Sequence, residues 1–218
     1  MIMDYELWIA GRTVTSENCN NISNFSGVSG RVSYDPSSNT LTLDNATINA
    51  TGKDYAIKSK IDGLTIRVIG TCTLTSEYVN ALVFDFDYYS DNTITITGGK
   101  LKLSARWFGL NACWGVSLTI DNCNIESDGT FGSNNNNAEI TINNSNITAK
   151  SMRGIQKLTL NGCTITYPSD AYYSSELRAI TRDGNNELND EIVITANGSG
   201  YTGGSGNASE ADYTRRRH

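Results

Sequence analysis

A short motif recurs along this chain and constrains its fold more than any other feature of the sequence. Each copy has an aliphatic residue, then Asn or Gly two positions later, a small residue, and a second aliphatic five positions after the first; the copy around Val68 is looser, with one inserted residue. The first aliphatics of the copies are Leu43, Val68, Ile96, Ile120, Ile142 and Leu160. Their spacings of 25, 28, 24, 22 and 18 residues are too short for independent domains and typical of one structural repeat.

Units of this size cannot bury an apolar face alone, so we expect them to stack, with aliphatics at equivalent positions forming ladders. The Asn or Gly after each short strand tolerates the positive φ that a sharp bend needs. The sequence therefore predicts an all-β protein, a single-stranded right-handed parallel β-helix (a solenoid) of about six to seven coils with an N-terminal cap. An antiparallel β-sandwich is the alternative. The bend residues Asn45, Asn122 and Asn144 are expected to hydrogen-bond one another along the stack.

The two ends of the chain depart from the repeat. Residues 1–31 are predicted to form a capping segment, in which Tyr5–Thr15 makes a hairpin that turns at Gly11 and puts Trp8 in the core. Residues 32–197 are assigned to the β-helix, with a last strand at Asp190–Ala196. Residues 198–218 are rich in Gly and Ser, which predicts a flexible tail.

Composition excludes several functional classes. The single histidine is His218 at the chain end, which excludes a Ser-His-Asp triad and a histidine-based zinc site. The net charge is −6 and the dense basic run is confined to Arg215–Arg217, so nucleic acid is not an expected partner. The five cysteines include no Cys-x-x-Cys pair, and we expect most of them to be buried thiols. No apolar run is long enough for a membrane span, and no signal peptide is recognisable at the start of the sequence.

Two blocks near the N-terminus carry a family resemblance. They are Tyr5–Thr15 (YELWIAGRTVT) and the stretch from Val32 to Ile48, which contains VSYDP and NTLTLDNATI. Together with the later repeats they resemble secreted or surface β-helix proteins of gut bacteria of the Bacteroidales type, often described as carbohydrate-binding domain-containing. The resemblance implies an extracellular or cell-surface location, a polysaccharide or glycan partner, and a non-catalytic carbohydrate-binding or adhesive role.

Aromatic residues between the repeat strands are the candidates for glycan contact. In a stack of repeats, such connecting segments fall on one side and form a continuous surface. An aromatic ring there can cover the apolar face of a sugar while nearby polar groups bond its hydroxyls. Burial against the flank of the stack is the other interpretation. The candidates are Tyr88, Tyr89, Trp107, Phe108, Trp114, Tyr172 and Tyr173.

A calcium-dependent polysaccharide lyase is the enzymatic alternative. Its calcium would be held by Asp85, Asp87 and Asp91, with Arg106 or Arg153 taking the proton from the substrate. A solvated loop explains the three aspartates equally, and a polar turn explains the oxygen-rich Asp183–Glu191. No cofactor other than Ca²⁺ is expected. A structural, virion or protein-interaction scaffold is the remaining alternative.

Overall fold

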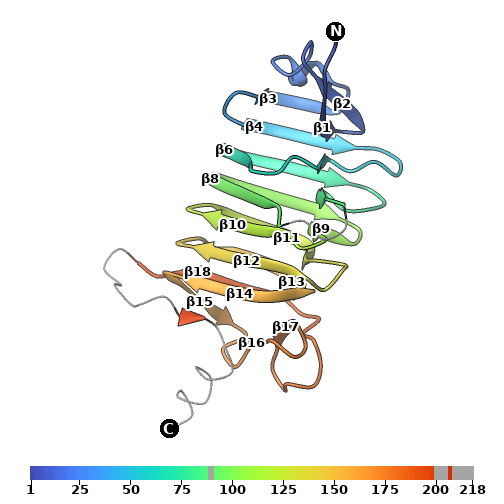
Figure 1. Ribbon diagram of the computed structural model, residues 1–218. Helices are drawn as coiled ribbons and strands as arrows, with labels where there is room; N and C mark the ends of the chain where they lie inside the picture. Colours follow the sequence, from blue (N-terminus) through green and yellow to red (C-terminus); the bar gives the residue numbers. More distant parts are fainter. Residues whose placement is uncertain (88–90, 199–205, 208–218) are drawn as a thin grey trace.

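The computed structural model describes residues 1–87 and 91–198, and the backbone of residues 206–207. Its strands join into one large, mostly parallel sheet, so the predicted all-β class is confirmed. Successive strands lie one above another from the N-terminal to the C-terminal end (Figure 1). The described residues include one short 3-10 helix, Ile22–Asn24, and no helix that is long and apolar enough to cross a membrane.

The repeated motif forms the first of three ladders of parallel strands. It begins with the first halves of β4 (Thr40–Ala50), β6 (Leu64–Ser76) and β8 (Thr93–Ala105), and continues with β10 (Ser117–Asp121), β12 (Ala138–Asn143) and β14 (Ile155–Asn161). One row of inward aliphatics runs through all six strands and is between 0 and 6% exposed: Leu41, Ile66, Ile96, Ile120, Ile142 and Leu160. This row is one part of the hydrophobic core.

The alignment of the motif was wrong at one step of this ladder. Val68 pairs with Leu43 as expected, but on its other side it pairs with Gly98, whereas Ile96 pairs with Ile66. The bend of β8 therefore comes two residues earlier in the ladder than the bends of β4 and β6. Glycine permits this, because a Cβ at Gly98 would lie 2.4 Å from the Val68 carbonyl oxygen.

The bends between the first and second ladders have the predicted backbone, and we call this edge of the stack the turn corner. Every residue two positions after a motif aliphatic has a positive φ: Asn45 (47°), Gly70 (66°), Gly98 (86°), Asn122 (49°), Asn144 (45°) and Gly162 (65°). Bonds between stacked amides are made by neighbouring residues instead of the bend residues themselves. Asn146 donates to Asn124 Oδ1 at 2.7 Å, and Asn161 donates to Asn143 Oδ1 at 2.8 Å.

The second and third ladders complete the stack. The second continues from the latter halves of β4, β6 and β8 into β11 (Asn124–Gly132) and β13 (Ile147–Arg153). The third contains β5 (Ile57–Ser59), β7 (Leu82–Asp85) and β9 (Phe108–Cys113), followed by the ends of β11 and β13. Its inward row is fully buried: Leu82, Leu110, Phe131 and Met152. The segments that connect these two ladders, residues 51–56, 77–81, 106–107, 128–129 and 150, form what we call the pocket corner.

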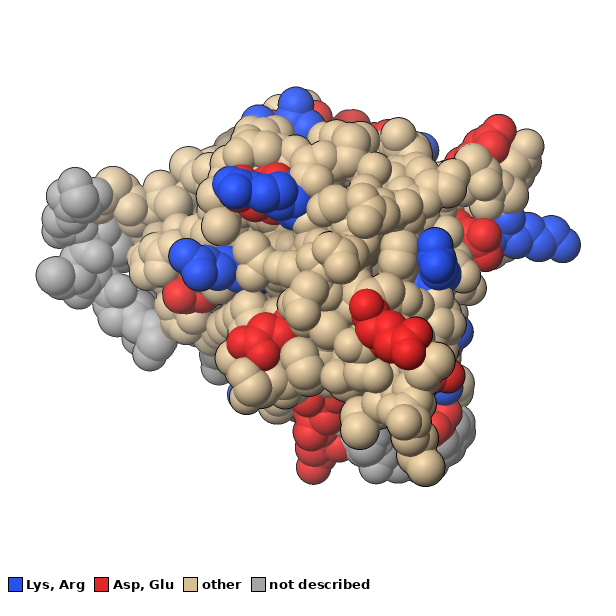
Figure 2. All heavy atoms as spheres, turned by 90° about the horizontal axis from the view of Figure 1, so that it is seen from above, with Lys and Arg blue, Asp and Glu red and all other residues tan. Residues whose placement is uncertain are grey.

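Antiparallel strands cover the N-terminal end. β1 (Asp4–Ile9) and β2 (Arg12–Thr15) form the predicted hairpin, which turns at Gly11 with φ 78°. β1 pairs with β5, and β3 (Val28–Asp35) pairs with β4. Trp8 is half-buried instead of lying in the core, with Lys58 Nζ 5.5 Å from its ring centre. Viewed from this end, acidic and basic side chains are interspersed on a largely uncharged surface (Figure 2).

The C-terminal end also departs from parallel stacking. Asp190–Ala196 contains the predicted strand, but this strand runs antiparallel between β13 and β15. Residues 199–205 and 208–218 of the predicted tail lie outside the described residues. The strands of this end are β15 (Cys163–Tyr167), β16 (Tyr172–Ser174), β17 (Ala179–Thr181), β18 (Ile192–Ala196) and β19 (Gly206–Asn207), the last pairing with β14.

Candidate functional site

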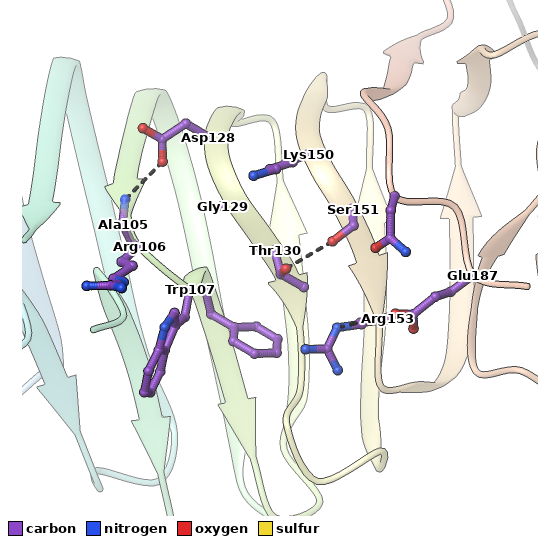
Figure 3. A pocket seen from close by; sticks show the side chains of 12 residues that line it. Ala105, Arg106, Trp107, Asp128, Gly129, Thr130, Lys150, Ser151, Arg153 and Glu187 are labelled. Carbon is purple, nitrogen blue, oxygen red and sulfur yellow. Dashed lines mark hydrogen bonds and ion pairs between the residues drawn. The ribbon is translucent and has the colours of Figure 1, made fainter. Parts of the chain in front are cut away.

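A surface pocket of about 460 Å³ lies at the pocket corner and is the candidate site (Figure 3). Arg106 and Trp107 come from the connection between β8 and β9, while Asp128 and Thr130 come from β11. The remaining charged and hydroxyl groups come from β13 and from the segment between β17 and β18: Lys150, Ser151, Arg153 and Glu187. Strands far apart in the sequence therefore meet at one point on the surface.

Backbone contacts hold the Trp107 segment against β11. The Thr130 N–H donates to the Trp107 carbonyl oxygen at 2.9 Å. A Cβ on Gly129 would lie 2.7 Å from the same oxygen, so this close approach requires a glycine. The Trp107 side chain itself projects outward and is 60% exposed. The result is a fixed backbone that presents a free indole ring at the pocket.

Asp128 fixes the segment that leads into Arg106. Its Oδ1 accepts a hydrogen bond from the Ala105 N–H at 2.9 Å, and its Oδ2 accepts one from Ser104 Oγ at 2.7 Å. Both carboxylate oxygens are thus engaged with the end of β8. Asp128 thus holds the end of β8, which precedes Trp107, by two hydrogen bonds.

The floor of the pocket carries two hydroxyl groups. Thr130 and Ser151 are paired in the register of β11 and β13, and their Oγ1 and Oγ atoms lie 2.9 Å apart. Each hydroxyl can both donate and accept a hydrogen bond. They can therefore bond further hydroxyl groups that enter the pocket.

Arg153 contacts two neighbours, Phe108 and Glu187. Its Cζ lies 5.0 Å from the centre of the Phe108 ring, within the range of a cation–π contact. Its Nε lies 3.9 Å from Glu187 Oε1, at the outer limit of an ion pair. Phe108 is only 5% exposed, so its ring is held by packing. These two contacts favour an orientation of the arginine beside the pocket.

The aromatic candidates from the sequence do not form one surface. Trp107 and Phe108 line the pocket, whereas Trp114 follows β9 at the next corner of the stack. Tyr173 is 4% exposed and donates to the carbonyl oxygens of Ile155 and Gln156, and burial raises its pKa to about 12. Tyr172 is half-buried on the same strand, β16. Tyr88 and Tyr89 lie outside the described residues.

The acidic candidates lie away from the pocket. Asp85 pairs with Lys58 at 3.0 Å, and Asp87 pairs with Lys60 at 3.2 Å. In the described ranges, which include Asp91, no three Asp, Glu, His or Cys side chains gather as they would around a metal ion.

The other oxygen-rich segment, Asp183–Glu191, begins with a turn that Asp183 holds together. Hydrogen bonds from the Asn186 side chain and from the Asn185 and Asn186 N–H groups lower the pKa of Asp183. These bonds are local to the turn.

Arg106 and Arg153, the two arginines considered as proton acceptors in a lyase, both line the pocket.

Sequence reasoning missed most of the polar residues of the pocket. Asp128 and Lys150 lie in the short segments that follow the second ladder, and Glu187 lies in the segment between β17 and β18. It also missed Tyr78, which is 45% exposed in the adjacent connection, where the Val79 carbonyl oxygen lies 3.5 Å from Trp107 N. The repeat contained a usable signal for three of these residues. Asp128 and Lys150 each lie three positions after the second aliphatic of a repeat, and Tyr78 lies four positions after it.

Comparison with protein-family models, with curated proteins and with solved structures finds no match to this chain.

Proposed function

We propose that this chain is a right-handed parallel β-helix that binds carbohydrate without catalysis, as an adhesive or glycan-binding module at a bacterial surface. The order of the ladders supports the winding. Each repeat contributes one strand segment to the first ladder, then the second, then the third, before the next repeat begins. Parallel connections of this kind are right-handed in nearly all proteins.

The exposed Trp107 ring beside a hydroxyl floor is the observation that carries the binding proposal. The Trp107 side chain is 60% exposed, so most of its ring is available to a partner. The ring offers a flat apolar surface, and Thr130 and Ser151 offer hydrogen bonds at 2.9 Å from each other. Sugars require this combination of an apolar face and hydroxyl partners.

The pocket favours binding over lyase chemistry. Asp85 and Asp87, the carboxylates considered for calcium, are paired with lysines and do not line the pocket. Within the pocket, Asp128 is engaged by two donors from β8. The resemblance of the N-terminal blocks and repeats to secreted β-helix proteins supports the proposed surface location.

A glycan array tests this function directly. We expect the purified protein to bind a defined set of glycans, and Trp107→Ala to reduce that signal about tenfold or more, since a stacked ring contributes one to a few kcal/mol. Ile69→Ala is the matched control, because Ile69 is an exposed apolar residue at the turn corner. Absence of binding across the array by a folded protein would overturn the proposal and favour the scaffold alternative.

A further inference from the structure

We propose that the pocket binds the anionic group of an acidic sugar, a carboxylate or a sulfate ester, beside the Trp107 ring. This inference rests on the proposed function, because it names the class of carbohydrate that the same pocket takes.

The net charge of the pocket lining is opposite in sign to the net charge of the chain. The chain has a net charge of −6, yet the pocket is lined by three cationic side chains and two carboxylates. The cations are Arg106, Lys150 and Arg153, and the carboxylates are Asp128 and Glu187. A locally positive pocket on an acidic protein attracts anionic ligands and is less attractive to neutral ones.

The carboxylates leave much of this positive charge available. Asp128 is held by two hydrogen bonds from β8, and Glu187 contacts only the Nε side of Arg153 at 3.9 Å. Arg106 and Lys150 are exposed, and neither forms an ion pair with another described residue. An incoming anion would therefore meet cations that are not already neutralised.

Arg153 has the geometry to recognise a planar or tetrahedral anion. The Phe108 ring and Glu187 contact its guanidinium, and its side chain remains 38% exposed. The planar guanidinium matches the paired oxygens of a carboxylate or sulfate. The neighbouring hydroxyls of Thr130 and Ser151 can bond the ring hydroxyls of the same sugar.

Calorimetric titration of paired glycans tests the inference. Each acidic oligosaccharide is compared with a neutral twin: oligogalacturonate with its methyl ester, a sialylated oligosaccharide with its asialo form, and a sulfated oligosaccharide with its desulfated form. We expect at least one acidic member to bind about tenfold more tightly than its twin, the usual effect of a hydrogen bond to a charged group. The three pairs distinguish a carboxylate from a sulfate.

Charge-removing variants assign the effect to the pocket. Lys150→Gln and Arg106→Gln should each weaken binding of the acidic member several-fold, about the size of an exposed charge contact, and leave the neutral twin unaffected. Arg67→Gln and Lys157→Gln are matched controls, since both cations are exposed on the first ladder. Lys150 and Arg106 are both exposed, so their replacement should not impair folding.

The outcomes separate this inference from the proposed function. Equal affinities for the members of every pair, or losses that are as large in the control variants, would overturn the inference while the glycan-binding function stands. Binding of no glycan by the wild-type protein would overturn both.

Discussion

The turn corner and the pocket corner of the stack are built on different principles. The turn corner repeats the same backbone at every level, with Asn or Gly at positive φ and little variation in length. The pocket corner connects the second and third ladders with segments that range from residues 51–56 to the single residue 150. The first corner thus determines how the strands stack, and the second is free to vary its side chains and to form a site.

The largest predicted difference between the corners concerns glycine. Gly98→Ala at the turn corner should destabilise the protein by about 3 kcal/mol, because it adds a contact of 2.4 Å with the Val68 carbonyl oxygen to an unfavourable φ. Gly52→Ala at the pocket corner has a similar φ of 62° but nothing within 4 Å of its Cβ, and should cost about 1 kcal/mol. Urea denaturation measures both values. Equal losses of unfolding free energy in the two variants would contradict the proposed difference between the two corners.

The second prediction concerns pH and the buried thiol of Cys123, beside the Asn122 bend. Burial raises the pKa of this thiol from 9.0 to about 12. The folded protein holds the thiol proton more tightly than the unfolded chain does. The protein therefore has its full stability with respect to this group below pH 9, and loses stability as the pH rises toward 12. One such group contributes a slope of up to about 1.4 kcal/mol per pH unit in that window.

Cys123→Ala should therefore flatten the loss of stability with pH between pH 9 and 12, apart from a constant cost for the missing sulfur. Denaturant midpoints of the two proteins across this range provide the measurement. Parallel pH profiles would show that the turn corner does not shield its thiol.

The smallest expected effect is on the stability of a Trp107 variant. Since the side chain is 60% exposed and its backbone contacts do not depend on the ring, Trp107→Ala should change the free energy of unfolding by less than about 0.5 kcal/mol. Thermal and urea unfolding provide the check. A loss of several kcal/mol would mean that the ring packs in the fold and is not available to a ligand.

The sequence predicted the turn corner well because residue type alone determines its backbone. Only Asn and Gly adopt positive φ at low cost, and both the all-β class and the bends are confirmed. The alignment failed at Gly98, where two adjacent glycines allow the bend to shift and no side chain marks its position. The winding of the sheet as a solenoid stays a prediction.

The pocket was only partly predictable. Trp107 stood out as an aromatic residue in a connection, and it is 60% exposed, whereas Phe108 beside it is 5% exposed. Lys150 and Glu187 reach the pocket only through the stacking of strands that are distant in sequence. Glu187 lies outside the repeat and carries no periodic signal, so its convergence with Lys150 required the three-dimensional arrangement.

Nuclear magnetic resonance provides the most direct test that the pocket corner is the binding surface. The chain has three tryptophans, so the indole N–H signals of Trp8, Trp107 and Trp114 can be assigned with single Trp→Phe variants and followed during titration with a glycan identified on the array. We predict that the Trp107 signal shifts together with the backbone amides of Gly129, Thr130 and Ser151. Shifts confined to the turn corner, or a Trp107 signal that does not move at saturation, would contradict the account.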